Sequence, residues 1–414
     1  MRVCQVGTGT LPVGSGVAGG AERFVHYLAK GLQALGHEVT VVDATAPPRG
    51  ETPYRLSEVP PSANGSGNPL AHAARGLLFG RAVAQRLSRL LREERFDVVN
   101  FHSQFSGLLG IPVARRLGVP AIFTMHNPLW SDEAACRSPW QHARFWMERR
   151  AEAQAGAAIY LSEAVMENRR RFFGLAAGKA RVVPLGVDES WFARRRPSAA
   201  VRRKYAPNAE AVLLHVARIA PYKNQMALVK ALPAIAREAP SVRAVFVGPV
   251  DSPRYLDALR REVAGASLQE RVVFAGNVPA EELAQMYSLA SVFVLPSLME
   301  NCPQSLLEAM AQGAAVVASD IAPLRPMLEG VAPLVPPLDH GALAKALLPL
   351  LRERDARQSL GRRARRRAWE RYRWGLIARE TAEVYRTWLP AAAGRLPYFE
   401  HGESLADGKS KHAG

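Results

Sequence analysis

The sequence predicts an α/β fold with two doubly wound domains that face a central cleft. Short apolar runs typical of buried parallel strands alternate with longer amphipathic segments typical of helices. This alternation occurs twice, once before and once after residue 185. The length of 414 residues is that of two domains of ordinary size, and a cleft between such domains is the expected ligand site.

The first half begins with one strand–helix–strand unit. Residues 3–7 and 38–43 are the expected strands, and residues 21–35 between them have apolar side chains at the spacing of a helix. Residues 44–72 are rich in Pro, Ser, Gly and Asn, so we expect a long loop there. A helical segment follows, and further strands are expected at residues 97–102, 120–127 and 158–162.

The second half repeats this pattern. Strands are expected near residues 212–216, 243–248, 272–276, 291–295 and 314–318, with helices between them. The last residues, 391–414, are small, polar and charged, and we expect them to be disordered.

Composition indicates a globular protein, with 48% hydrophobic and 22% charged residues. The first residues form a short strand and a glycine turn rather than the apolar core of a signal peptide. No apolar run approaches the length of a membrane span. The three cysteines have neither disulfide nor zinc-site spacing. We therefore expect a cytoplasmic protein.

Residues 352–373 contribute about +7 of the formal net charge of +17. Residues 352–373 contain ten arginines and three acidic residues. Such a segment can contact an anionic membrane or nucleic acid, or it can be the solvated face of an Arg- and Ala-rich helix. We favour the solvated face and leave a peripheral contact with the inner face of the membrane open. No nucleic-acid-binding module accompanies the charge, so we expect no nucleic-acid partner.

The richest stretch for chemistry follows the expected strand 291–295. Glu300 lies in a loop at the carboxyl end of that strand, where open α/β sheets bind ligands. Pro303 suits the first position of a helix and Gly313 suits its end, so Glu308 lies inside the helix. The amino end of this helix, near Asn301 to Ser305, offers free N–H groups that suit phosphate. Two carboxylates beside an anion site fit a sugar whose hydroxyls bind the carboxylates while its phosphate binds the amides.

Two other segments have polar side chains at strand ends. Arg218 and Lys223 bracket a turn between a strand and a helix, where both cations can reach one diphosphate; the alternative is two exposed cations. His126 ends the strand 120–127, and His102 has a similar position with a weaker case. From position alone, a structural role would be the better interpretation of either histidine.

A glycine-rich segment, residues 14–19, has the Gly-x-Gly-x-x-Gly spacing of a dinucleotide site, and Asp43 ends the next strand. This pattern makes an NAD-dependent oxidoreductase an alternative. The fit is poor, because Gly14 comes seven residues after Gly7 and the dinucleotide turn must follow the strand directly.

Together these motifs resemble the retaining glycosyltransferases of family 4, which have the GT-B fold. Glu300 and Glu308 are followed by Ala-Met-Ala-Gln-Gly, Arg218 and Lys223 have the family's spacing, and Gly19-Gly20-Ala-Glu-Arg resembles the start of the family's first helix. The likeness extends over residues 1–390. It implies two Rossmann-like domains at 1–185 and 186–370, and a helix at 371–390 that crosses back to the first domain.

The resemblance also implies roles for individual residues. Gly19 and Gly20 would approach the donor phosphates, and Arg218 and Lys223 would clamp the diphosphate. Glu300 would bind the sugar hydroxyls, Glu308 the ribose, and His126 would face the donor sugar. The implied catalytic residues are His126, Arg218, Lys223 and Glu300, and the implied donor-binding residues are Gly19, Gly20, Arg218, Lys223, Asn277, Val278, Glu300, Asn301, Cys302, Ser305, Leu306 and Glu308.

The implied reaction transfers a sugar, with retention, from a nucleotide sugar, UDP- or GDP-linked, to an acceptor hydroxyl. No cofactor is implied and no metal, since no Asp-x-Asp ends a strand and side chains supply the cations. Cys302-Pro303 stands where many members have Phe-Gly, and Pro303 lacks an N–H, so the donor sugar is not carried over. The acceptor is unidentified, and residues 44–72 and 127–146 are expected to select it. A sugar-nucleotide epimerase and a non-enzymatic basic binding protein are further alternatives.

Overall fold

The structure is a computed structural model that describes residues 1–9, 13, 19–44, 52–60, 69–126, 139–173 and 177–389. Residues 14–18 of the glycine-rich segment, residues 127–138 of the expected acceptor region and the expected disordered tail 391–414 lie outside the described residues.

The first domain is built on a parallel sheet. In the described residues its strand order is β3-β2-β1-β4-β5-β6-β7. The central strand β1 pairs in parallel with both β2 and β4, so that Val6 lies opposite Val42 on one side and Phe101 on the other. The strands are β1 (Arg2–Val6), β2 (Glu38–Ala44), β3 (Arg55–Val59), β4 (Val98–Phe101), β5 (Ala121–Met125), β6 (Ala157–Tyr160) and β7 (Ala180–Val182).

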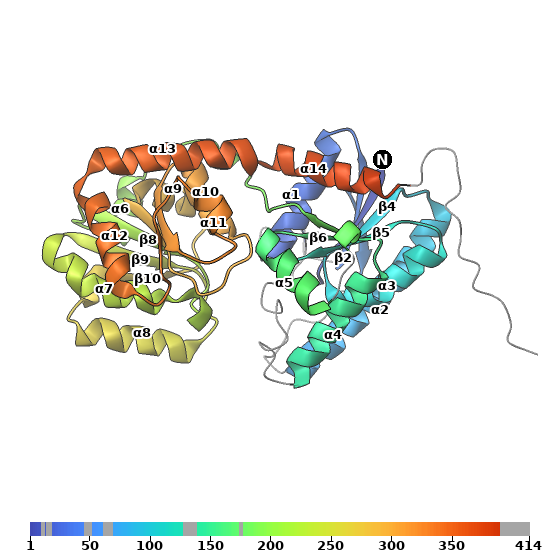
Figure 1. Cartoon of the computed structure of the whole chain (residues 1–414), viewed down its shortest axis with the longest axis horizontal. Helices are drawn as coiled ribbons and strands as arrows, with labels where there is room; N and C mark the ends of the chain where they lie inside the picture. Colours follow the sequence, from blue (N-terminus) through green and yellow to red (C-terminus); the bar gives the residue numbers. More distant parts are fainter. Residues whose placement is uncertain are drawn as a thin grey trace, which may run out of the picture.

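Helices cover both faces of this sheet (Figure 1). Val3 packs in the hydrophobic cluster that contains Phe24 and Leu28 of α1, whereas Cys4 packs in the cluster that contains Phe79 of α2. Burial on both faces explains why these strands are nearly continuous apolar runs. The helices are α1 (Gly20–Ala34), α2 (Pro69–Glu93), α3 (Gln104–Arg116), α4 (Pro139–Gln154) and α5 (Glu163–Phe173).

The expectation of one long loop over residues 44–72 is wrong. Strand β3 pairs in parallel with β2 from Arg55 to Val59, and α2 already begins at Pro69. β3 is an edge strand with one neighbour, and its side chains are a mixture of exposed, half-buried and buried ones instead of an apolar run. Its short, mixed sequence therefore gave no strand signal between the turn-forming residues on either side.

The second domain repeats the architecture around a parallel sheet with the order β10-β9-β8-β11-β12-β13 in the described residues. Its strands are β8 (Ala211–Val216), β9 (Val242–Val247), β10 (Val272–Gly276), β11 (Val292–Leu295), β12 (Ala315–Ser319) and β13 (Leu334–Val335). Its helices are α6 (Ala199–Tyr205), α7 (Gln225–Glu238), α8 (Pro253–Gly265), α9 (Ala280–Leu289), α10 (Gln304–Gln312), α11 (Arg325–Leu328) and α12 (His340–Arg352).

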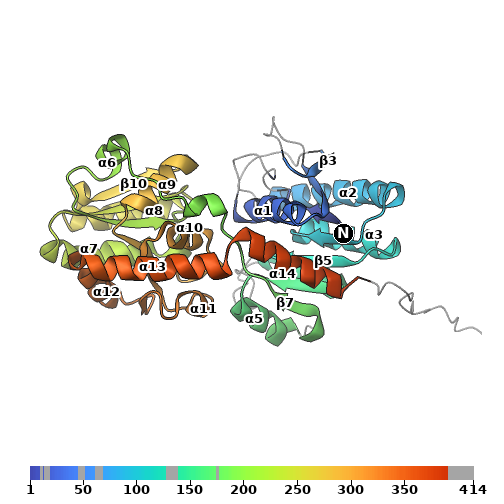
Figure 2. The ribbon, with the colours of Figure 1, turned by 90° about the horizontal axis from the view of Figure 1, so that it is seen from above.

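Two consecutive helices join the domains along one side of the molecule. Helix α13 (Arg354–Arg371) packs on α10 and β12 of the second domain, and α14 (Trp374–Thr387) packs on α1 of the first. Figures 1 and 2 show this pair spanning both domains. The predicted fold, with its helix crossing back to the first domain, is therefore confirmed. The exact boundaries at residues 185 and 370 stay a prediction.

None of the helices in the described residues combines the length and the apolar character that are needed to span a bilayer.

The close packing of α13 against the end of α10 leads to a prediction about stability. A Cβ at Gly361 would collide with the carbonyl oxygen of Gly313, which ends α10 with a positive φ of 76°. Gly361→Ala should therefore lower the free energy of unfolding by about 1–3 kcal/mol in denaturant titrations. Gly265→Ala is the matched control, because a Cβ there meets nothing within 4 Å. Equal stability of both variants would contradict this packing.

Candidate active site

A cavity of about 470 Å³ lies between the two domains. Its walls come from segments that follow strands of both sheets. Thr8 follows β1, His126 follows β5, Arg218 follows β8 and Glu300 follows β11, and all four line the cavity. The carboxyl ends of the parallel strands therefore meet at one site, as the sequence predicted.

Lys223 and Glu300 are held together by two loops of the second domain. Asn224 adopts the left-handed conformation, with φ of 53°, and its amide donates to the carbonyl oxygens of Pro296 and Pro337 at 2.9 and 2.7 Å. The backbone N–H of Leu298 donates to the carbonyl of Tyr222 at 2.9 Å. The bonds to Pro296 and from Leu298 join the loop after β8 to the loop after β11, and the bond to Pro337 joins it to the loop after β13.

The result is a close ion pair at the cavity wall. Lys223 Nζ lies 2.7 Å from Glu300 Oε1, which also accepts from Ser297 Oγ at 2.8 Å. The side chains are 17% and 6% exposed. An ammonium has three donors, so Lys223 can bind Glu300 and still donate to an anion in the cavity.

Arg218 lines the same cavity from a more open position. Its guanidinium donates to Asp251 at 3.1 Å, and both side chains are about half exposed. An exposed pair of this kind is weak, so the guanidinium can turn to a stronger anion at small cost. The structure thus brings both predicted diphosphate-binding cations to one cavity.

The amino end of α1 contributes backbone N–H groups. Gly19 precedes the helix without a side-chain cap, and Gly19 and Gly20 both line the cavity. A Cβ at Gly19 would lie 2.6 Å from Oε2 of Glu22, whereas a Cβ at Gly20 would meet no protein atom within 4 Å. Uncapped N–H groups and the helix dipole favour an anion here.

Helix α10 faces the cavity with its own amino end. It begins at Gln304, with Pro303 as the uncapped residue before it, so Pro303 lies one position earlier than predicted. Asn301, Cys302 and Gln304 line the cavity. Burial raises the pKa of the Cys302 thiol to about 12, so the thiol stays protonated at neutral pH and is a poor nucleophile.

His126 meets a second histidine at the cavity. Its Nε2 lies 2.9 Å from Nδ1 of His102, and both residues line the cavity. Burial lowers the pKa of His126 to about 3 and holds the pKa of His102 well below its usual range. Both rings are therefore neutral at pH 7. His102, which had the weaker case from sequence, is the direct partner of His126.

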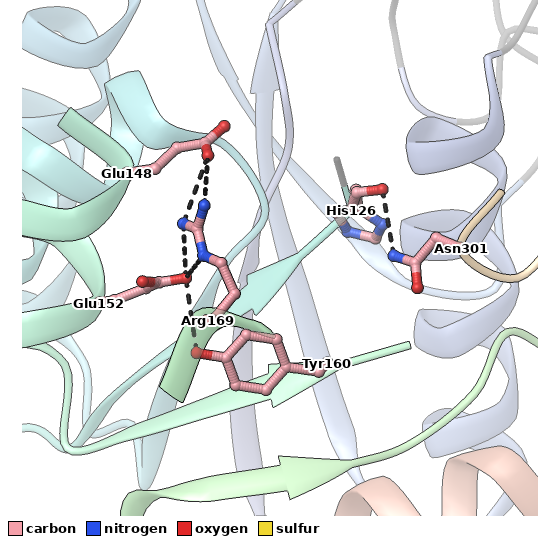
Figure 3. A network of polar contacts seen from close by, with 6 residues as sticks. All are labelled: His126, Glu148, Glu152, Tyr160, Arg169 and Asn301. Carbon is pink, nitrogen blue, oxygen red and sulfur yellow. Dashed lines mark hydrogen bonds and ion pairs between the residues drawn. The ribbon is translucent and has the colours of Figure 1, made fainter. Parts of the chain in front are cut away.

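The side chain of Asn301 bridges the domains. Its Oδ1 accepts from Ser162 Oγ at 2.8 Å, and its Nδ2 donates to the carbonyl oxygen of His126 at 3.5 Å (Figure 3). Asn301 therefore fixes the start of α10 against the first domain, and its side chain is already engaged in protein contacts.

Glu308 is buried on α10 and does not line the cavity. Its carboxylate accepts from Arg23 of α1 at 2.8 Å and from Tyr287 at 3.0 Å. Burial raises the pKa of Glu308, and the Arg23 charge opposes that shift. The predicted ribose ligand is thus also one half of an ion pair between the domains, and its contact with ribose stays a prediction.

Four other predicted donor-binding residues lie outside the cavity wall: Asn277, Val278, Ser305 and Leu306. Leu306 is fully buried in the core, and its contact with the donor stays a prediction. Asn277 is exposed beyond the end of β10.

Asp43, the residue that suggested a dinucleotide site, has another function. Its Oδ2 accepts from the backbone N–H of Val13 at 2.6 Å, and the side chain is buried. A Cβ at Gly7 would lie 2.8 Å from the carboxyl carbon of Asp43. The carboxylate therefore holds the loop after β1.

No role was predicted from the sequence for some cavity residues, among them Thr8, His72, Arg144 and Tyr222. Thr8 donates to the carboxylate of Glu22 in the first turn of α1. Arg144 and His72 come from α4 and α2, helices whose approach to the cavity depends on packing. Single polar residues on amphipathic helices look alike until that packing is known.

A buried charge cluster anchors α4 behind the cavity (Figure 3). Arg169 of α5 is fully buried and donates to Glu152 at 2.8 Å and to Glu148 at 3.3 Å. Burial raises the pKa of Glu148 to about 7. The Arg169 charge opposes this shift, and the nearby Glu152 carboxylate adds to it. This cluster fixes the helix that carries Arg144 to the cavity.

The fold is that of GT-B glycosyltransferases. The model of Glycosyltransferase Family 4 matches residues 18–191, and the model of Glycosyl transferases group 1 matches residues 199–367. D-inositol 3-phosphate glycosyltransferase of Kineococcus radiotolerans is 32% identical over 419 residues, which cover 93% of this chain and 95% of that protein. The chain therefore belongs to glycosyltransferase family 4 and is a glycosyltransferase.

Solved structures share the fold. Sucrose-phosphate synthase from Thermosynechococcus elongatus is 24% identical with a TM-score of 0.76, covering 93% of this chain and 98% of that one. Anabaena HepE in complex with UDP and glucose is 18% identical with a TM-score of 0.73, covering 94% of this chain and 100% of that one. The oxidoreductase and epimerase alternatives are not favoured by these relatives.

The buried cluster predicts a pH-dependent stability. The pKa of Glu148 is raised in the folded state from its ordinary 4.5 to about 7, so stability should be lost as pH rises through this range. Glu148→Gln removes that ionisation and keeps an acceptor for Arg169. The melting temperature of the variant relative to the unaltered protein should rise by about 3–6 °C between pH 5 and pH 8.

The matched control is Glu167→Gln, an exposed carboxylate on the same helix as Arg169. Its melting temperature should follow that of the unaltered protein at every pH. Parallel pH curves for Glu148→Gln and the unaltered protein would contradict the assignment.

Proposed function

We propose that the protein transfers a sugar, with retention of the anomeric configuration and without a metal, from a UDP- or GDP-linked donor to an acceptor hydroxyl. The observation that carries this proposal is the Lys223–Glu300 pair, at 2.7 Å, in one cavity with Arg218 and the amino ends of α1 and α10. Cations and free N–H groups suit a diphosphate, and the carboxylate beside them suits sugar hydroxyls.

Charge that develops on the leaving diphosphate is stabilised by groups already in place. Lys223 and Arg218 supply full charges, and Gly19 and Gly20 supply backbone N–H groups. Preorganised electrostatic stabilisation of this kind commonly contributes more to catalysis than any other single effect. Glu300 binds hydroxyls of the transferred sugar, and neutral His126 offers that sugar a hydrogen bond.

The donor class is supported by a structural relative. Anabaena HepE, which shares the fold, was solved in complex with UDP and glucose. At 18% identity that likeness supports a nucleotide-sugar donor and leaves the sugar open. Relatives at about 30% identity act on acceptors as different as D-inositol 3-phosphate and glycogen, so the acceptor stays unassigned.

Metal independence is supported by the same cations. In the part of the chain that the structure describes, no group of three or more His, Cys, Asp or Glu side chains is arranged to hold a metal. We infer that side chains and helix ends supply the positive charge that a metal would otherwise provide. No resident cofactor is proposed.

A peripheral contact with an anionic membrane is supported by α13. Arg362, Arg363, Arg366 and Arg371 are exposed on it, and Trp369 is 43% exposed beside them. Clustered arginines are attracted to anionic lipid, and an exposed tryptophan suits the membrane interface. This contact and the cytoplasmic location stay predictions.

The first experiment is a thermal-shift screen with UDP, GDP, ADP, dTDP and NAD, each with EDTA and with Mg²⁺. One nucleoside diphosphate should raise the melting temperature equally in both conditions, because a ligand that binds the folded state stabilises it. When the corresponding nucleotide sugar is the donor, NMR of the glycosylated product should show the same anomeric configuration as in the donor. A shift with NAD alone would contradict the transferase, and a shift that needs Mg²⁺ would contradict metal independence.

Lys223→Ala tests the diphosphate contact. The variant should lower kcat at least tenfold, because it removes a charge that acts on the leaving group. Initial rates with the identified donor measure this, and circular dichroism melting checks the fold. Lys204→Ala, which breaks a surface ion pair with Glu282, is the matched control and should keep full activity. Full activity of Lys223→Ala would remove Lys223 from the site.

A further inference from the structure

A chain of buried hydrogen bonds runs from His126 to the helix that crosses back. His126 Nε2 lies 2.9 Å from His102 Nδ1, and His102 Nε2 lies 2.7 Å from Gln5 Oε1. Gln5 Nε2 donates to the hydroxyl of Tyr385 at 2.9 Å. Gln5 and Tyr385 are completely buried and His102 is 4% exposed, so water does not compete for the two bonds of the Gln5 amide.

Tyr385, at the other end of this series of hydrogen bonds, has further hydrogen bonds of its own. The Tyr385 hydroxyl also accepts from Asn100 Nδ2 at 2.8 Å, and Asn100 Oδ1 accepts from Thr124 Oγ1 at 2.9 Å. Tyr385 is therefore the common acceptor of two buried amides, one from β1 and one from β4. With the hydroxyl accepting from both amides, the Gln5 side chain has Nε2 toward Tyr385 and Oε1 toward His102.

This orientation determines the protons along the relay. A carbonyl oxygen only accepts, so His102 must carry its proton on Nε2 to bind Gln5 Oε1. His102 is neutral, so its Nδ1 has a lone pair and accepts from Nε2–H of His126. His126 is also neutral, and its Nδ1 is therefore left with a lone pair that can accept from a hydroxyl. Reversal of the Gln5 amide would reverse each of these assignments.

Aromatic packing also connects the His126 ring to the start of α14, where the chain crosses back to the first domain. Phe24 stands edge-on to His126 with ring centroids 4.8 Å apart, and to Trp374 at 5.2 Å. Trp374 is the first residue of α14, and its backbone N–H donates to the carbonyl of Val187 at 3.3 Å. Helix α14 thus reaches His126 by hydrogen bonds through Tyr385 and by ring contacts through Trp374.

We propose that Tyr385 is a positioning residue for His126: through Gln5 and His102 it fixes which ring nitrogen of His126 carries the proton, and so presents an acceptor to a hydroxyl of the bound sugar. The catalytic relevance rests on the proposed function, whereas the tautomer assignment is independent of any substrate. Tyr385 touches no cavity residue through its hydroxyl and acts only through the relay.

The test is Tyr385→Phe, which keeps the ring and removes the shared acceptor. We expect kcat to fall about 10- to 100-fold, as is usual when the partner of a functional histidine is lost, and KM for the nucleotide sugar to change less than twofold. The thermal shift with the nucleoside diphosphate should be retained. Tyr255→Phe is the matched control, because Tyr255 also accepts from an N–H, that of the Met226 backbone, but lies outside the relay.

A second readout needs no substrate. Long-range ¹⁵N–¹H spectra of histidine-labelled protein report the ring tautomers, and His126→Gln assigns the His126 signals. The unaltered protein should show His126 protonated on Nε2, and Tyr385→Phe should show both tautomers. Gln5→Met, which removes the amide but keeps an unbranched side chain, should have the same effect and serves if Tyr385→Phe does not fold.

An unchanged His126 tautomer in these variants, or an unchanged kcat in Tyr385→Phe, would overturn the proposal. A protein with the expected tautomer but no sugar transfer would instead contradict the proposed function, so the two failures are distinguishable.

Discussion

The site depends on a short backbone contact between the two segments that connect the domains, one at Val187 and one at Tyr372 to Trp374. The N–H of Val187 donates to the carbonyl of Tyr372 at 2.6 Å, and the N–H of Trp374 donates back to Val187 at 3.3 Å. A Cβ at Gly186 would lie 2.6 Å from the indole of Trp374, so glycine lets that ring lie against the segment that leaves the first domain. Because each parallel sheet binds ligands at one edge, the cleft exists only if this crossing makes the two edges face each other.

The contacts across the cleft follow from that crossing. Arg23 of α1 reaches Glu308 of α10, and Ser162 after β6 reaches Asn301 before α10. The first contact ends on α10 and the second ends in the loop just before it, and the amino end of α10 faces the cavity. Removing one partner would leave a buried polar group unpaired, which costs more free energy than the contact contributes. The start of α10 is therefore placed by the first domain as well as by its own sheet.

Much of the fold and part of the site follow from local sequence patterns, and the rest requires contacts between distant residues. The positions of His126, Arg218 and Glu300 after apolar strands follow from the sequence, and strand ends of a parallel sheet lie at the ligand edge. The roles of His126 and Arg218 were predicted only from the resemblance to family 4. The ion pairs of the site were not predictable from local patterns, because their partners are far apart in the sequence. Arg23 and Glu308 are 285 positions apart, and Lys223 and Glu300 are 77 apart. Strand β3 was missed because an edge strand needs no apolar run.

Charge balance explains why acidic residues lie in a site for an anionic donor. Glu300 alone would repel a diphosphate, but its carboxylate is neutralised by Lys223 and accepts from Ser297. Arg218 adds a cation whose exposed partner, Asp251, is easily displaced, and each helix amino end adds about half a positive charge. The cavity therefore remains net positive around the expected phosphates. Glu300 in turn holds the ammonium in place, so the ion pair both orients Lys223 and keeps an acceptor at the position where sugar hydroxyls would lie.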